Sequence, residues 1–260
     1  MNATIAAQMT GADFLKLRKK RGTVIWALAL AALPLVIFFI VRAAQHSSNA
    51  LKYEPAGGLS GYTDGLRIIA LFFGPLAAIM IGTDAGAADV TSGVFRDLIV
   101  TGRSRLALFA TRVPAALGLT WLVIAVAYAL LLIGTFAFAS NAPTPSASLL
   151  LNGLAFSAMT TGVICVVAVG FASLTASRAA ALTALIGWHL VASPILASIS
   201  SLGGSRKLLL SEAMSHFSPV HVGDRSGSVS MAGGTALLVL VVWAGLFLAL
   251  GAWRTRTMDA

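Results

Sequence analysis

The chain has 260 residues, of which 58% are hydrophobic and only 10% are charged, and its mean hydropathy is +0.89. These values exclude a soluble globular protein and are typical of a polytopic membrane protein. A formal net charge of +9 would suit nucleic acid, but Lys and Arg also gather in the cytoplasmic loops of membrane proteins. We therefore expect the chain to contact a lipid bilayer and no nucleic acid.

Six apolar runs are long enough to cross a bilayer as helices, which takes about 20 residues each. The last run, LLVLVVWAGLFLALGAW, is apolar at nearly every position, whereas a membrane-spanning strand would alternate apolar and polar residues. The sequence therefore predicts an all-α protein with a single transmembrane domain over residues 1–260. The expected spans are Thr23–Val41, Leu66–Thr83, Val113–Ala139, Leu149–Thr175, Ala179–Ser201 and Gly233–Trp253.

The first apolar run resembles a signal peptide because KLRKKRG precedes it. It is longer than the usual apolar core of such a peptide and no clear cleavage site follows, so we expect it to be retained as a span. The fourth and fifth spans are separated only by a few residues around Arg178, which predicts a tight antiparallel hairpin.

The distribution of basic residues predicts the orientation. Twelve of the 18 Lys and Arg residues fall on the side of the membrane that holds the N-terminus. Because cytoplasmic loops carry the excess of Lys and Arg, we expect both termini in the cytoplasm, with a longer outer loop over residues 202–232. An even number of spans agrees with this arrangement.

Residues 1–22 precede the first span and are predicted to form a short cytoplasmic helix at the membrane interface. Phe14, Leu15 and Leu17 would dip into the bilayer while the basic residues face anionic headgroups. An ordinary basic flank that only sets topology explains the same segment equally well.

The sequence contains no P-loop, no H-E-x-x-H motif and no G-x-S-x-G motif, and its one cysteine, Cys165, lies in an apolar run. We therefore expect no enzyme activity, no metal and no cofactor of its own. His216, His221 and Asp224 do not have the spacing of a strong metal signature. An amphipathic or partly re-entrant outer segment over KLLLSEAMSHF is the favoured interpretation of this region.

His189 is the exception among spans that are otherwise almost free of ionisable groups in their deep parts. A proton relay is one interpretation of an intramembrane histidine. A neutral imidazole hydrogen-bonded to a neighbouring helix is the other, and it is favoured because no Asp or Glu lies nearby in the same span. Asp64, Arg67 and Asp84 fall at the calculated ends of the second span and are interpreted as interface anchors.

The segment between the second and third spans, residues 84–112, is too long and too patterned for a simple turn. Val90, Val94 and Ile99 share an apolar side, whereas Asp89 and Arg96 stay polar. TGRSR then breaks the pattern before Leu106 begins the next apolar run. This predicts a short charged helix across the cytoplasmic mouth of the bundle.

At these residues the chain resembles the permease subunits of ABC transporters of the exporter type. That family commonly has an acidic residue, then GT-x-R-x-L-L, a turn ending P-x-S-R-x-x-L and a basic residue, which is Arg112 in this chain. Three positions depart from this pattern: Asp89 stands for Glu, Val94 for Thr, and Thr101–Gly102 for Pro. The residues that would couple the chain to an ATPase are Asp89, Gly93, Phe95, Arg96, Asp97, Leu98, Arg103 and Arg105.

The resemblance implies a half-transporter in a bacterial plasma membrane. The coupling helix would dock in a separate ATP-binding cassette subunit, which binds the ATP, and a second permease would complete a homodimer or heterodimer. Spans with almost no charge suit export of an apolar or amphipathic substrate, such as a drug, lipid or modified peptide. The alternatives are a secondary carrier driven by an ion gradient and a non-transporting membrane anchor or immunity protein.

Overall fold

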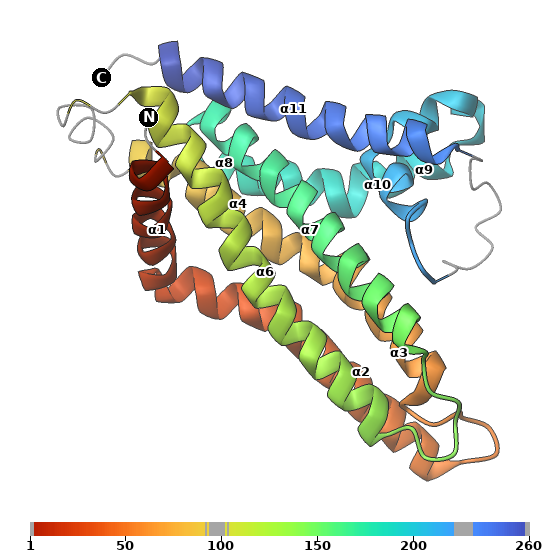
Figure 1. The fold of residues 1–260 in the computed structure, drawn as a ribbon. Helices are drawn as coiled ribbons and strands as arrows, with labels where there is room; N and C mark the ends of the chain where they lie inside the picture. Colours follow the sequence, from red (N-terminus) through yellow and green to blue (C-terminus); the bar gives the residue numbers. More distant parts are fainter. Residues whose placement is uncertain (1–2, 92, 94–101, 103, 221–230, 258–260) are drawn as a thin grey trace.

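The computed structural model describes residues 3–91, 93, 102, 104–220 and 231–257, and every regular element within them is helical (Figure 1). The helical elements, including the π-helical η1 and η2 and the 3₁₀-helical η3, are α1 Ala3–Lys19, α2 Arg21–Ser48, α3 Gly58–Arg67, η1 Ile68–Phe73, α4 Gly74–Thr91, α6 Arg105–Ala137, α7 Ala147–Thr175, α8 Arg178–Gly187, η2 Trp188–Ala192, α9 Ser193–Ser198, η3 Ser200–Leu208, α10 Leu210–Ser215 and α11 Gly233–Thr257. The prediction of an all-α fold is confirmed.

Six of the helical stretches are long and apolar enough to cross a membrane, as the sequence predicts. They are Arg21–Ser48, Gly58–Val90, Arg105–Ala137, Ala147–Thr175, Arg178–Ser198 and Gly233–Thr257.

The second span begins at Gly58 rather than at the expected Leu66. Asp64 and Arg67 interrupt the apolar run in the sequence, and the expected span therefore started after the first of them. In the structure both side chains join one ion-pair cluster, with Asp64 3.0 Å from Arg42 and 3.3 Å from Arg67. Because the charges offset one another, the helix continues through them.

Serine residues begin three of the long helices. Ser104, Ser146 and Ser177 each accept a hydrogen bond from the backbone N–H three residues later, at the starts of α6, α7 and α8. Between α7 and α8 only Ala176 and Ser177 remain, and Ala176 adopts a left-handed conformation with φ of 51°. The predicted tight hairpin is therefore present.

The helices α4, α6 and α7 form the centre of the bundle, and α4 crosses α7 at close range. A Cβ atom at Gly86 would lie 2.8 Å from the Ala172 side chain and 3.1 Å from the Ser173 backbone nitrogen. A larger residue at Gly86 would therefore separate the two helices.

The N-terminal helix α1 packs along α6 as well as presenting apolar residues outward. Leu17 is buried and Phe14 contacts the core, whereas Leu15 is exposed. The expected helix is therefore present, but two of its three apolar side chains face the protein. The predicted outer segment also folds onto the bundle, because α10 buries Leu210, Ala213 and Met214.

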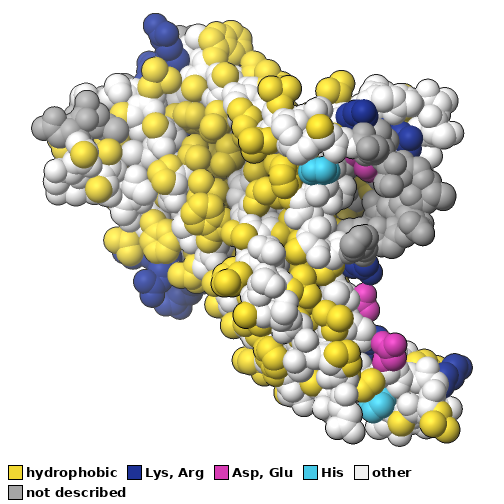
Figure 2. All heavy atoms as spheres, turned by 45° about the vertical axis from the view of Figure 1, so that its right-hand side comes forward, with side chains coloured by type: hydrophobic (Ala, Val, Ile, Leu, Met, Phe, Trp, Pro, Cys, Tyr) yellow, Lys and Arg dark blue, Asp and Glu magenta, His cyan; other side chains and the backbone are white. Residues whose placement is uncertain are grey.

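The helices come together at one end of the bundle, here called the closed end, and spread apart toward the other (Figure 1). The α1 helix, the start of α6 and the end of α11 lie at the closed end, where Arg105 Nη1 donates to the Arg256 carbonyl over 3.3 Å. From there α7 packs against both α6 and α11, while α11 runs away from α6. Hydrophobic side chains cover the middle of the face in Figure 2, and Lys and Arg lie toward its margins, as expected for a surface in contact with lipid.

Candidate functional site

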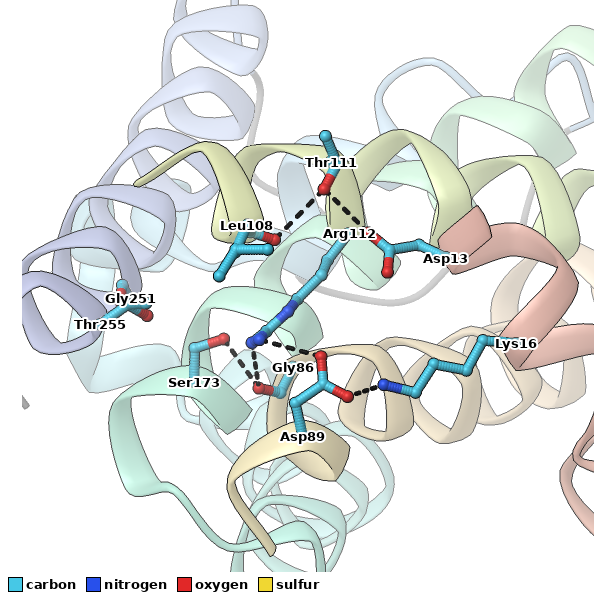
Figure 3. Close-up of polar contacts among 10 residues, drawn as sticks. All are labelled: Asp13, Lys16, Gly86, Asp89, Leu108, Thr111, Arg112, Ser173, Gly251 and Thr255. Carbon is cyan, nitrogen blue, oxygen red and sulfur yellow. Dashed lines mark hydrogen bonds and ion pairs between the residues drawn. The ribbon is translucent and has the colours of Figure 1, made fainter. Parts of the chain in front are cut away.

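The closed end of the bundle holds a buried ionic cluster centred on Asp89 (Figure 3). Asp89 lies in the last turns of α4 and is only 4% exposed. Its carboxylate forms ion pairs with Lys16 of α1 and with Arg112 of α6, whose Nη2 is 3.0 Å away. The cluster therefore joins three helices that are distant in the sequence.

Arg112 also connects the cluster to α7. Its Nη1 donates to the Gly86 carbonyl over 3.3 Å, and the Ser173 hydroxyl donates to the same carbonyl over 3.1 Å (Figure 3). On the other side, the Thr111 hydroxyl donates to Asp13 of α1 over 2.8 Å. Burial lowers the pKa of Lys16, and the carboxylate of Asp13 acts in the opposite direction.

Asp84 forms a second buried carboxylate site on α4, with 2% exposure. It accepts a hydrogen bond from the Thr23 hydroxyl and lies 2.8 Å from Arg178 Nε of α8. Lys20 Nζ, between α1 and α2, is 3.6 Å away. Through Asp84 and Asp89 together, α4 is linked by ion pairs to α1, α6 and α8 and by the Thr23 hydrogen bond to α2.

The expected coupling loop, residues 84–112, is shorter in the structure because α4 continues to Thr91 and α6 begins at Arg105. Gly93 and Gly102 are exposed, and both have positive φ angles, of 74° and 77°. Such angles favour glycine because it has no Cβ. Phe95, Arg96, Asp97, Leu98 and Arg103, and the short helix expected over them, lie outside the described residues.

Asp89 and Arg105 were expected to form part of an exposed docking surface, but the structure places them against other helices of the chain. Asp89 faces the interior of the bundle, and Arg105 reaches α11. Three residues of the cluster were not predicted from the sequence: Lys16, which pairs with Asp89, Asp13, which accepts from Thr111, and Ser173, which donates to the Gly86 carbonyl. Asp84, interpreted from the sequence as an interface anchor, is buried. The only sequence feature that could have pointed to the buried carboxylates was the scarcity of acidic residues, of which the whole chain has nine.

His189 lies far from this cluster, in the π-helical segment η2, and lines a cavity of about 370 Å³. Its Nε2 is 3.0 Å from the Leu71 carbonyl oxygen of η1. A carbonyl only accepts, so Nε2 carries the proton and donates. This is a hydrogen bond to a neighbouring span, the interpretation that the sequence favoured over a relay.

The two π-helical segments that this bond joins have the same local cause. Each ends directly before a residue–proline pair, Gly74–Pro75 after η1 and Ser193–Pro194 after η2. Proline has no N–H for the carbonyl four residues earlier, and π-helical turns are one way in which a membrane helix accommodates this loss. For Pro75 that carbonyl belongs to Leu71, the acceptor of His189.

Of the candidate metal trio, only His216 lies among the residues that the structure describes. His216 packs edge-on against Phe217, with ring centroids 5.2 Å apart, and His221 and Asp224 lie outside the described residues. Among described residues no three His, Cys, Asp or Glu side chains come together at metal-binding distance.

No protein-family model matches the chain, and a search of the curated proteins finds no match. Two features of the described residues bear on function: the ionic cluster between α4 and α6 and the cavity beside His189. The first can transmit force between helices, and the second can hold a small molecule.

Proposed function

We propose that this chain is the membrane-spanning permease subunit of an ATP-driven transporter of the ABC exporter type. A separate ATP-binding cassette ATPase binds the ATP, and a second permease completes the transporter. The protein resides in the plasma membrane of a bacterium with both termini in the cytoplasm, and it exports an apolar or amphipathic substrate.

The observation that carries this proposal is the ionic cluster at the base of residues 92–104. Asp89 and Arg112 lie on the two helices that enter and leave this segment, and they are paired at 3.0 Å. Lys16 and the Gly86 carbonyl extend the connection to α1 and to the α4–α7 crossing. A displacement applied to the segment would therefore move several spans together, as a rigid-body transition requires.

The location of basic residues supports the orientation. The basic residues of α1, together with Arg105, Arg112, Arg178, Arg254 and Arg256, lie at the closed end, where α4 ends and α6 begins. An excess of positive charge marks the cytoplasmic side of membrane proteins. A cytoplasmic ATPase would thus meet the proposed docking segment.

A carrier driven by an ion gradient is the second candidate, because Asp84 and Asp89 are buried carboxylates at one end of a span. Carriers use such groups as ion or proton sites. Here each carboxylate has at least two basic partners, which favours a structural role. The energy source of transport separates the two candidates, since vanadate inhibits ABC ATPases and a protonophore collapses the gradient.

Affinity purification from native membranes tests the proposal. The tagged chain should recover an ATPase that contains a P-loop. Arg96→Glu should lower that recovery by about tenfold or more, because a reversed charge at an interface costs at least about 1.4 kcal/mol. Arg254→Glu, which reverses an exposed charge at the same end, and Lys52→Glu, on the opposite side, serve as controls.

Two results would contradict the permease assignment. One is recovery of the intact chain without an ATPase. The other is transport that resists vanadate and stops with a protonophore, which would support the carrier instead.

A further inference from the structure

The cavity beside His189 lies within one chain, between the second, fourth, fifth and sixth spans and the short helix α10. Its volume of about 370 Å³ falls in the range of pockets that hold drug-sized molecules. None of the described residues that line it is Asp, Glu, Lys or Arg. A charged group placed there would lose its hydration without gaining a charged partner, so the cavity selects an uncharged group.

Aromatic rings form one wall of the cavity. Trp188 and Trp243 have ring centroids 5.9 Å apart, Trp243 and Phe247 are 5.8 Å apart, and Phe171 and Phe247 are 5.6 Å apart. These four rings all line the cavity. Such a wall favours a ligand that itself contains rings, because ring pairs add to the effect of apolar burial.

Polar side chains interrupt the apolar lining at a few positions, and one of them, the Ser215 hydroxyl, donates to the Glu212 carbonyl over 2.9 Å. The hydroxyl groups of Ser193 and Ser211 are 2.7 Å apart and bridge the fifth span and α10. His189 commits Nε2 to the Leu71 carbonyl, and its Nδ1 makes no hydrogen bond with any residue that the structure describes. In the neutral ring Nδ1 is an acceptor, so it suits a ligand with an O–H or N–H donor.

The rim of the cavity indicates where such a ligand enters. Phe72 and Leu190 line the cavity, yet they are 47% and 44% exposed. Both lie on π-helical segments in the interior of long apolar spans. The opening therefore faces the lipid side of the bundle rather than either aqueous end.

We propose that this cavity binds an uncharged, ring-containing amphipathic molecule that enters from the bilayer and donates one hydrogen bond to Nδ1 of His189. The proposal rests on the proposed transport function, which it deepens by naming a substrate site and a substrate class. Apolar burial supplies most of the affinity, and the single hydrogen bond fixes the orientation of the donor group.

Photolabelling of the purified full-length chain in nanodiscs tests the site. The probe is 4-hydroxybenzophenone, which carries rings and a phenol donor, and 4-methoxybenzophenone is the matched probe without the donor. At mildly acidic pH, labelling by the phenol probe should saturate and should be reduced by 4-phenylphenol as a competitor. Mass spectrometry should locate the label on residues 68–75, 184–194 and 243–247. The methoxy probe should label this site about fivefold less, since one hydrogen bond contributes about 1 kcal/mol.

Variants that fill the cavity provide the controls. Ala197→Phe and Val167→Phe place new volume in the lining from different helices and should each abolish the saturable labelling. Leu238→Phe adds a ring on an exposed face of α11 and should leave it unchanged. Gel filtration identifies any variant that fails to fold. If one cavity variant fails, the other one tests whether filling the cavity abolishes labelling.

Unsaturable labelling spread over lipid-facing residues would overturn the proposal. Equal labelling by the two probes would overturn the hydrogen bond to His189, and saturable labelling that survives both cavity variants would overturn the location. The assay contains no ATPase, so its failure leaves the proposed permease function standing. Conversely, a chain that binds the probe but recovers no ATPase would contradict the permease assignment alone.

Discussion

Asp89 illustrates how much one carboxylate does at the closed end of this bundle. Its two oxygens are paired with Lys16 and with Arg112, and Arg112 is itself almost completely buried. A buried ion pair contributes little net stability compared with apolar residues of the same size. Removing one member of the pair is strongly destabilising, because it leaves the other charge buried without its partner.

We predict that Asp89→Asn lowers the free energy of unfolding by about 3 kcal/mol or more, since the buried Arg112 would lose the carboxylate that is paired with it at 3.0 Å. Denaturation of the purified chain in mixed detergent, followed by tryptophan fluorescence, measures the loss. Asp64→Asn is the control: the Asp64 side chain is 41% exposed, and the loss of such a pair should cost about 1 kcal/mol or less. Equal losses in the two variants would refute a special role for the buried cluster.

At the scale of elements, η1 and η2 are irregular segments in the middle of two spans. Both precede a proline, and His189 of η2 donates to the Leu71 carbonyl of η1. Two irregular segments therefore support each other at the wall of the cavity. Local π-helical turns in membrane helices are frequently found at functional sites.

We predict an energetic coupling between His189 and Pro75. In the native chain His189→Phe removes the donor to Leu71 and should cost about 1–2 kcal/mol. In a Pro75→Ala background the new N–H of residue 75 can bond to the Leu71 carbonyl, so the same change should cost about 1 kcal/mol less. A double-mutant cycle on unfolding free energies measures the difference.

Pro194→Ala is the matched control for this cycle, because its N–H would serve the carbonyl of Leu190 and not that of Leu71. The cost of His189→Phe should be unchanged in that background. An identical cost in all three backgrounds would show that Pro75 and His189 are independent.

At the scale of the whole molecule, the chain has a charged closed end and apolar sides. Exposed apolar residues cover the outer faces of α2, η2 with α9, and α11. Exposing these faces to water would be unfavourable, whereas contact with lipid is not. The basic residues at the closed end then set which side of the membrane that end occupies.

Cysteine labelling measures the orientation. In a Cys165→Ala background, a membrane-impermeant maleimide added to intact spheroplasts should label cysteines placed at Asn49 and Asn141. Cysteines placed at Ala7 and Thr257 should react only in inverted vesicles. All four positions are exposed in the structure. Labelling of Ala7→Cys in intact spheroplasts would reverse the proposed orientation and would remove residues 92–104 from the cytoplasm.

The number of spans and most of their bounds could be read from the sequence because each is a local property. A bilayer demands a minimum length of apolar helix, and residues such as Leu149–Thr175 meet it regardless of their neighbours. The hairpin at Arg178 followed in the same way from the shortness of the gap. The start of the second span was predicted too late because the partners of Asp64 and Arg67 were unknown.

Partners of this kind are what only the tertiary structure could supply. Asp89 contacts Lys16 and Arg112, Asp84 contacts Arg178, and His189 is hydrogen-bonded to Leu71 at the cavity wall. Each pairing depends on how the helices are rotated and where they cross. Composition cannot predict this, because all the apolar helices have similar compositions. A charged residue in an apolar span is therefore easy to find in the sequence. Which side chain neutralises it depends on how the whole bundle packs.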